Sequence, residues 1–263
     1  MRKAVVAEKI CQVDNTDLKY IHNPYSTQPT AAIQAVAGTY SVSAFSTTED
    51  SLTVTDEVIY GEHVFDFERI MSDFDLMSAR FDEMAYAIAW GVDYFVLNSL
   101  CEDGTGAYTT PAGGFTTAAN INVIISNLCS KVMGFQDTRK GYFLVIENTD
   151  VPGFMQAQMA NGFSFADAAL NNGFMTSYGG VEIYVVRTGT FVTATIGSRS
   201  DIANLDHRVF GVKGVATYAS PRGLQYDEKG VSGKTGKEIS VAALVGFKLW
   251  EQKKSLIVDI TLA

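Results

Sequence analysis

The period of apolar and polar positions changes near residue 66, and this change separates two predicted elements. Residues 40–60 alternate in polarity as two strands do, and the polar residues 48–51 predict the turn that joins them. A lone two-stranded hairpin is marginal in water, so this acidic hairpin needs a surface to lie on. A second copy of the same chain would supply one, which makes a self-assembling shell subunit the first hypothesis.

From Asp66 to about Leu100 the spacing predicts one long amphipathic helix. Roughly 35 residues at about 1.5 Å each give a rod of about 50 Å. The helix should end at Gly104, and its C-terminal half is apolar nearly all round, so that half should be the more buried. The apolar positions follow steps of three and four along one stripe: Ile70, Phe74, Met77, Phe81, Met84, Ile88, Val92 and Phe95.

From Phe115 the pattern becomes mixed α/β. We expect a helix that begins at Thr117 and is closed by Gly134, followed by a buried strand over 142–147. A second helix should carry Pro152 in its first turn and stop at 161–162. Paired strands over 180–187 and 190–196 and a strand region over 208–219 should follow. Alternating apolar residues over 239–249, a polar turn and an apolar return over 256–262 predict a terminal hairpin.

Composition narrows the class of protein. The 263 residues are 47% hydrophobic and 19% charged, which argues for a folded chain and against disorder. A net charge of -9 and a pI near 4.8 argue against a general nucleic-acid binder but not against a protein that encloses nucleic acid. Cys11, Cys101 and Cys129 lack metal or redox spacing and predict free thiols in a reducing compartment. The most apolar run, 85–97, is too short for a membrane span and contains Asp93.

Motifs for catalysis, cofactors and metals are absent from the sequence. The segment 230–235, GVSGKT, lacks the first glycine of a phosphate loop, and we expect a mobile surface loop there. His22, His63 and His207 are isolated and fit no metal-ligand pattern. We therefore expect no catalytic, cofactor-binding or metal residues.

Taken in order, these elements resemble the HK97-like major capsid proteins of tailed double-stranded DNA bacteriophages. The resemblance rests on element order and on textures such as FDFERIMSDFDLMSARFDEMAYAIAWGVDYFVLNSL and GYFLVIENTDVPGF. It implies an α+β fold with five parts: an N-terminal arm (1–38), an extended β-hairpin loop (39–64), a peripheral domain with the spine helix (65–114), a compact α/β axial domain (115–220) and returning peripheral-domain strands (221–263).

The resemblance also implies a function and a set of partners. Copies would form pentamers and hexamers of an icosahedral head in the host cytoplasm, and the virion shell would enclose double-stranded DNA without sequence-specific binding. A separate scaffolding protein, a portal and decoration proteins are possible partners, with no membrane and no cofactor. Two features depart from some family members. Residues 39–64 contain no Lys or Arg, which excludes a lysine cross-link from this loop, and only a short arm precedes the loop, so no long scaffolding segment is expected.

Charge predicts where copies meet. The hairpin and the helix are acidic, whereas residues 208–263 are basic on balance, so the two regions could be complementary between subunits or could simply be solvated. We expect that reversing Glu49 and Asp50 to Lys impairs shell formation without unfolding the subunit. The candidate contact residues are Glu49, Asp50, Asp56 and Glu57 on the acidic side and Arg80, Arg139, Lys140 and Arg208 on the basic side.

Three alternatives stay open from the sequence. An encapsulin-type nanocompartment shell shares the architecture and encloses protein cargo. An enzyme would have to use the α/β region 115–220, where no motif supports one. A tail-tube protein would be mostly β, which the long helix opposes.

Overall fold

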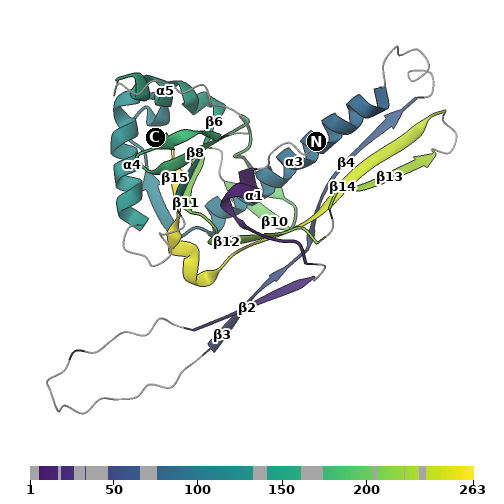
Figure 1. The fold of residues 1–263 in the computed structure, drawn as a ribbon, viewed down its shortest axis with the longest axis horizontal. Coiled ribbons are helices and arrows are strands. Elements are labelled where there is room, and N and C mark those ends of the chain that lie inside the picture. The colour runs from purple at the N-terminus through teal and green to yellow at the C-terminus, as the bar shows by residue number, and fades with distance from the viewer. Residues whose placement is uncertain are drawn as a thin grey trace.

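Two sheets share one long helix, α3 (Leu76–Asp103), in the computed structural model of the chain (Figure 1). The mixture of helices and sheets confirms the predicted α+β class. The structure describes residues 6–16, 19–26, 33, 47–65, 76–132, 141–160, 174–203, 206–221, 223–230 and 235–263.

The first sheet has six strands and forms the compact end of the molecule. Its inner strands are apolar at nearly every position because helices pack against it: α4 (Ala118–Val132), α5 (Val151–Ala160) and the C-terminal half of α3. Strands β6 and β8 run parallel, as do β5 and β15, and the other pairs are antiparallel. In spatial order the strands are β5 (Gly106–Thr109), β15 (Ile257–Thr261), β11 (His207–Val212), β6 (Tyr142–Glu147), β8 (Val181–Val186) and β7 (Phe174–Tyr178).

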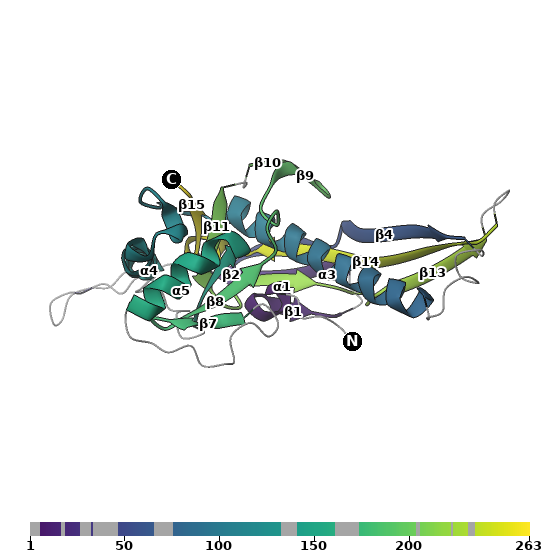
Figure 2. The ribbon, with the colours of Figure 1, turned by 90° about the horizontal axis from the view of Figure 1, so that it is seen from above.

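The second sheet has five strands and forms an elongated arm along α3 (Figure 2). Its longest strand buries Ile239, Val241 and Ala243 against Met84 and Ile88 of the helix, so the alternation seen in the sequence becomes the face that α3 covers. The strands are β1 (Gln12–Asp14), β12 (Ala216–Ala219), β14 (Lys237–Leu249) and β13 (Gln225–Gly230), with β4 (Asp56–Val64) also paired to β14.

Two-stranded ribbons and short helices complete the described fold. One ribbon pairs β2 (Tyr20–Ser26) with β3 (Thr47–Thr53), and the other pairs β9 (Thr193–Ile196) with β10 (Arg199–Ala203). The short helices are α1 (Val6–Ile10) and the 3-10 helices η1 (Gly114–Thr116), η3 (Asn148–Asp150) and η4 (Glu251–Leu256).

Elements predicted from local pattern are confirmed. The helix expected from Thr117 is α4, the buried strand over 142–147 is β6, and α5 carries Pro152 in its first turn. Helix α3 ends immediately before Gly104, and residues 95–101 are all buried, as the apolar pattern predicted. The expected start of this helix at Asp66 lies outside the described residues, as does the expected loop over 231–234.

Several predicted strand pairings are wrong. Strand β9 pairs with β10 and not with β8, and the region 208–219 is two strands that lie in different sheets. The terminal hairpin is also wrong, because η4 carries the chain from β14 in one sheet to β15 in the other. Turn residues mark where a strand ends, and they do not select its partner.

The predicted part boundaries differ from the observed sheets in two places. Residues 6–14, which fall in the expected N-terminal arm 1–38, join the core: α1 buries Val6, Ala7 and Ile10 there, and β1 pairs with β12. Strands β5 and β15, expected in the peripheral parts 65–114 and 221–263, belong to the six-stranded sheet.

Candidate functional site

The β2–β3 ribbon projects from the body of the molecule and corrects the predicted hairpin (Figure 1). Its register pairs Tyr20 with Thr53 and Ser26 with Thr47. The polar residues 48–51, expected as the hairpin turn, lie in the middle of β3, because an exposed ribbon needs no apolar alternation to pair. The expected first strand, 40–44, lies outside the described residues.

A small apolar cluster of the same chain holds the base of the ribbon. It comprises Leu52, Val54, Ala219 and Trp250, with Ile21 and Leu244 packed against it. Gly246 allows the close approach, because a Cβ there would lie 2.9 Å from a methyl of Val54. The surface that the predicted hairpin needed is therefore supplied, at its base, by the chain itself.

Asp50 adds a polar anchor at this base. It pairs with Lys248 Nζ at 3.0 Å and accepts the Glu251 N–H at 3.2 Å. Glu49, the neighbouring residue, points to the other side of β3, where its exposed side chain pairs with His22 across the ribbon. Of these two candidate contact residues, Glu49 is the one left accessible to a neighbouring copy.

Asp56 also makes its contacts within the chain. It is 8% exposed and accepts hydrogen bonds from Ser198 Oγ at 2.8 Å and Thr55 Oγ1 at 2.9 Å. Gly197 sits directly over the carboxylate with φ of 56°, where a side chain would clash with it. Asp56, a candidate for contact with a neighbour, thus anchors the β9–β10 ribbon to the start of β4 within one chain.

The remaining candidate contact residues differ in the solvent exposure of their side chains. Glu57 is exposed on β4, and Arg80 is half-buried on α3, where it pairs with Glu83 at 2.8 Å and lies 3.8 Å from Glu62. Arg139 and Lys140 lie outside the described residues. Arg208, the last candidate, is only 3% exposed and pairs inside the chain with Glu147 and Asp150.

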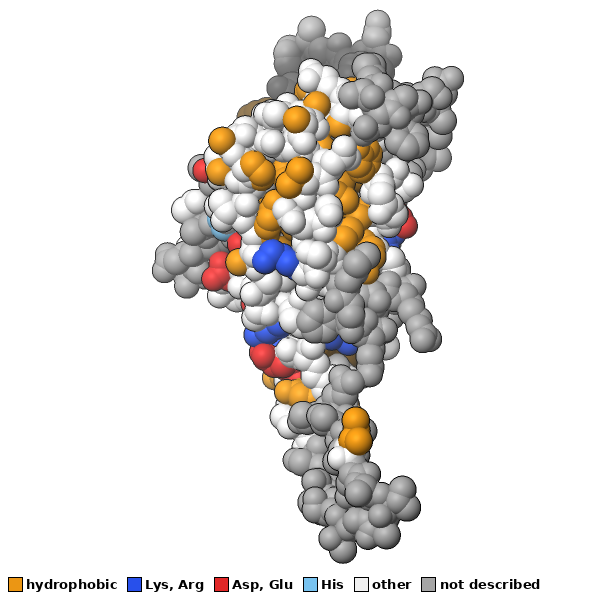
Figure 3. Space-filling model, turned by 90° about the vertical axis from the view of Figure 1, so that its left-hand side faces the viewer, with side chains coloured by type: hydrophobic (Ala, Val, Ile, Leu, Met, Phe, Trp, Pro, Cys, Tyr) orange, Lys and Arg blue, Asp and Glu red, His pale blue; other side chains and the backbone are white. Residues whose placement is uncertain are grey.

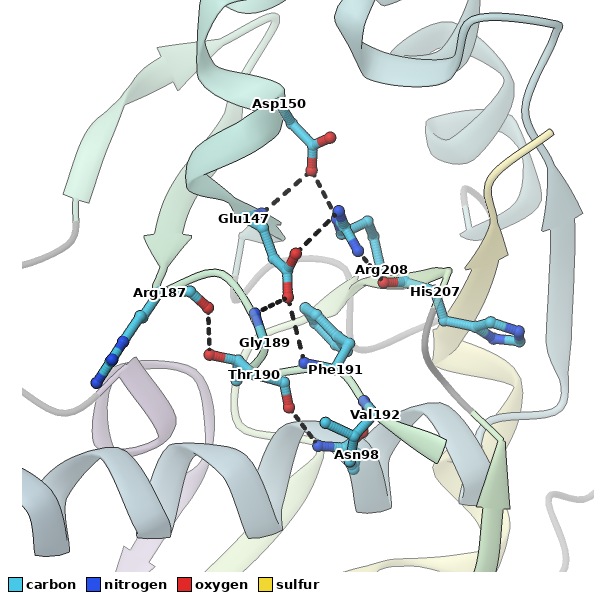
Figure 4. Close-up of polar contacts among 10 residues, drawn as sticks. All are labelled: Asn98, Glu147, Asp150, Arg187, Gly189, Thr190, Phe191, Val192, His207 and Arg208. Carbon is cyan, nitrogen blue, oxygen red and sulfur yellow. Dashed lines mark hydrogen bonds and ion pairs between the residues drawn. The ribbon is translucent and has the colours of Figure 1, made fainter. Parts of the chain in front are cut away.

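Arg208 belongs to a buried polar cluster that joins the six-stranded sheet to α3 (Figure 4). Its Nε donates to Asp150 at 2.6 Å and its Nη2 to Glu147 at 3.3 Å. Glu147 also accepts the N–H groups of Gly189 and Phe191, at 3.1 and 3.3 Å. The Glu147 N–H also donates to Asp150 at 3.1 Å. One guanidinium and three backbone donors thus satisfy two buried carboxylates, the condition under which a buried ion cluster is tolerated.

The same turn, residues 187–192, is held from its other side by α3. Asn98 donates to the Thr190 carbonyl at 2.7 Å and accepts the Val192 N–H at 3.1 Å (Figure 4). Trp90 Nε1 donates to Thr190 Oγ1 at 3.3 Å. The turn is therefore fixed between the six-stranded sheet and α3. It sets the position of the six-stranded sheet relative to this long helix.

Another buried carboxylate, Asp93 of α3, holds the N-terminal helix. It accepts the N–H groups of Val6 and Ala7 at 3.2 and 2.8 Å. Burial raises the pKa of this carboxyl to about 7, against the lowering effect of the two backbone hydrogen bonds. Glu8 raises the pKa slightly and Lys9 lowers it.

Cysteine chemistry does not define a site among the described residues. Cys11 and Cys101 are buried, and burial raises the pKa of both thiols, which keeps them protonated. Cys129 on α4 is half-buried, and burial raises its pKa as well. Within the described ranges, no three His, Cys, Asp or Glu side chains gather in a way that could hold a metal ion. No helix in the same part of the chain is long and apolar enough to cross a membrane.

Sequence analysis missed the residues that do most of this positioning: Asp93, Asn98, Glu147, Asp150 and Trp250. The first two carried a signal, because each is a polar residue within the apolar half of the predicted helix. Glu147 and Asp150 flank the end of a buried strand, where polar residues are also expected in an ordinary loop. Nothing in the sequence pointed to Trp250.

Solved structures share this fold. The capsid structure of the cyanophage P-SCSP1u matches with a TM-score of 0.73 and 14% identity, over 100% of this chain and 89% of that chain. A structure from Mycobacterium phage Che8 matches with a TM-score of 0.68 and 18% identity, over 92% and 84%. The capsid of an empty GTA particle matches with a TM-score of 0.67 and 15% identity, over 100% and 91%.

No protein-family model matches this chain, and no curated protein matches its sequence. At the identities above, the likeness to solved structures establishes the fold. The chain has the HK97-like capsid fold, as the order of elements in its sequence predicted.

Proposed function

We propose that this chain is the major capsid protein of a tailed double-stranded DNA phage, a structural subunit whose copies assemble as pentamers and hexamers of an icosahedral head. The observation that carries the proposal is the likeness to the cyanophage capsid over the whole of this chain. A match of that extent includes the ribbon, the long helix and both sheets, not only the compact α/β end that other folds could share.

The architecture of the subunit supports a role in assembly. The β2–β3 ribbon is anchored at its base by Trp250 and Asp50 and extends away from the body (Figure 1). A two-stranded ribbon that leaves its own core gains stability when another surface covers it. A neighbouring copy in a shell provides such a surface for every subunit.

The role is structural and not catalytic. In the described part of the chain, the most buried charged residues, Glu147, Asp150 and Arg208, are occupied with one another and with backbone N–H groups. They hold two structural units together. The α/β region 115–220 is therefore a packing unit in this proposal.

The shell encloses its DNA without sequence-specific binding. A net charge of -9 repels phosphates, so DNA is retained by closure of the shell and not by affinity for each subunit. In this proposal the protein assembles in the host cytoplasm and is located in the capsid of the virion. A capsid role implies three further kinds of partner: a scaffolding protein, a portal and decoration proteins.

Negative-stain electron microscopy of the purified full-length chain tests the proposal, with the ratio of absorbance at 260 and 280 nm as a measure of enclosed nucleic acid. We expect closed shells or rings of subunits. Shells that hold a protein cargo and no nucleic acid would contradict the phage role in favour of a nanocompartment. The absence of any assembly, both alone and after co-expression with a scaffolding protein, would contradict both.

A further inference from the structure

Three aromatic residues form a line along the solvent side of α3. Tyr86, Trp90 and Tyr94 recur every four residues, which places them on one side of the helix. That side lies opposite Ile88 and Val92, which are buried beneath the helix. Tyr86 is 42% exposed, and the other two rings are half-buried. We name these three residues the aromatic stripe.

Other parts of the chain flank the aromatic stripe on both sides. On one side Asp93 accepts two N–H groups of α1, so the N-terminus of α1 lies along this edge (Figure 1). On the other side Trp90 donates to Thr190 Oγ1 and Asn98 donates to the Thr190 carbonyl, which brings the turn over residues 187–192 alongside. The stripe is therefore a narrow line of rings, about 12 Å long, with a protein element on either side.

A cation stands beside the middle of the aromatic stripe. The Arg187 guanidinium lies 5.5 Å from the centroid of the Trp90 ring, and the centroids of Trp90 and Tyr94 are also 5.5 Å apart. The Arg187 side chain is exposed and points away from the buried cluster around Arg208 (Figure 4). Among the described residues no carboxylate forms an ion pair with Arg187. The stripe therefore offers a ligand both aromatic surface and a positive charge that no described carboxylate neutralises.

This surface differs from the rest of the exposed apolar area. At the compact end, apolar side chains lie among uncharged ones (Figure 3). On α3 the exposed apolar area is instead a row of Tyr and Trp rings. Such rings are typical of binding surfaces, because they bury a large area on contact and lose little rotamer freedom.

We infer that the aromatic stripe is a docking site for an extended segment of another protein, with apolar side chains at alternate positions and a carboxylate that pairs with Arg187. Residues four apart on a helix are about 6 Å apart along its axis. Alternate side chains of an extended chain are roughly 6.6–6.8 Å apart. Three successive side chains on one side of such a segment can therefore each contact one ring of the stripe.

Single-stranded nucleic acid would also stack on aromatic rings, but charge opposes it here. Asp82 and Glu83 are exposed one helical turn before Tyr86 and would repel phosphate groups at that end of the stripe. The net charge of -9 adds a repulsion over the whole molecule. A peptide with a single carboxylate beside Arg187 meets the positive charge and avoids the negative ones.

Fluorescence titration of the purified full-length chain with two synthetic peptides tests this site. The peptides SLSLSLE and SLSLSLK, with both ends blocked, carry the same apolar side chains and differ in the sign of one charge. The chain has two tryptophans and Trp250 is only 7% exposed, so a change in fluorescence on binding reports Trp90. We expect saturable binding, with the peptide that ends in Glu bound about fivefold more tightly.

Two substitutions and two matched controls assign the binding to the stripe. Arg187→Glu should reverse the preference between the peptides, and Tyr86→Ala should weaken the binding of both by about fivefold. Lys19→Glu makes the same charge change at another exposed position, and Tyr60→Ala removes another tyrosine that is 42% exposed. Both controls should bind as the wild type does, and circular dichroism checks that every variant folds.

Three results would overturn the inference. The first is the absence of saturable binding of either peptide to the wild type. The second is a preference between the peptides that Arg187→Glu leaves unchanged. The third is saturable binding of single-stranded oligothymidylate that Tyr86→Ala weakens, which would make the stripe a nucleic-acid site. Binding is measured on the subunit itself, so these results are separate from those of the shell assembly experiment.

Discussion

Arg208 on β11 donates its Nε to Asp150 across 2.6 Å, and both side chains are almost completely buried. This pair fixes the end of β6 and the start of α5 to the centre of the six-stranded sheet. With Glu147 and Asn98 it holds the turn over residues 187–192 against α3. The position of the compact end on the long helix therefore depends on a few polar contacts as well as on apolar packing.

Replacing Arg208 should unfold or strongly destabilise the subunit. Arg208→Met leaves the buried carboxylates of Glu147 and Asp150 without their counter-charge, and removal of one partner from such a cluster costs about 3–5 kcal/mol. Adding Glu147→Gln and Asp150→Asn should recover part of this loss. Urea unfolding of the purified chains measures it, with Arg80→Met at an exposed pair as the control. Equal effects of Arg208→Met and Arg80→Met would contradict the role of the cluster.

Glu49 and Asp50 should respond differently to charge reversal, although they are neighbours in β3. Asp50→Lys removes the contacts to Lys248 and the Glu251 N–H, and we expect a loss of about 1–3 kcal/mol in the free energy of unfolding. Glu49→Lys should leave that free energy unchanged and still reduce the yield of shells, because its side chain is exposed on the ribbon. Normal shells from Glu49→Lys would rule out a contact between this residue and a neighbouring copy.

Trp250 should control attachment of the ribbon. Its indole is 7% exposed, packs with Leu52 and Val54, and donates to Thr217 at 2.9 Å. Trp250→Ala should cost about 3–5 kcal/mol, because a large side chain leaves the cluster. Hydrogen exchange should speed up in β3 and stay slow in β6. Trp250→Phe keeps most of the packing and serves as the control, and unchanged exchange in β3 of the Ala variant would argue against this anchor.

Asp93 should make docking of α1 depend on pH. Its folded pKa of about 7 lies above the ordinary value of 3.8, so the folded chain holds a proton that the unfolded chain has lost. This group's contribution to stability is complete below about pH 4, falls by at most roughly 1.4 kcal/mol per pH unit as the pH rises, and is lost above about pH 7.

Urea unfolding across that range tests this sign. Asp93→Asn keeps an acceptor for the Val6 and Ala7 N–H groups and cannot ionise, so its stability relative to the wild type should rise with pH. Asp82→Asn, an exposed aspartate on the same helix, is the control. A constant difference between wild type and Asp93→Asn over the range would refute the assignment.

Local pattern predicted α4, α5, β6 and the end of α3, because each depends on neighbours in sequence. It failed where the fold depends on distant contacts. Strands β14 and β15 read as a hairpin, yet they pair with strands from other parts of the chain. The five residues of α1 are too few to show a period, and their docking depends on Asp93, more than 80 positions away. Opposite charge suggested contacts between copies, whereas Asp50 and Lys248 already satisfy each other within one chain.

The mass of the particles formed by the full-length wild-type chain tests the central claim most directly. Sedimentation velocity over a range of protein and salt concentrations measures it. The account predicts discrete species many times heavier than the 28.5 kDa subunit, as closed shells or rings of subunits. A single species of 28.5 kDa at every concentration would contradict the claim that this chain builds a shell.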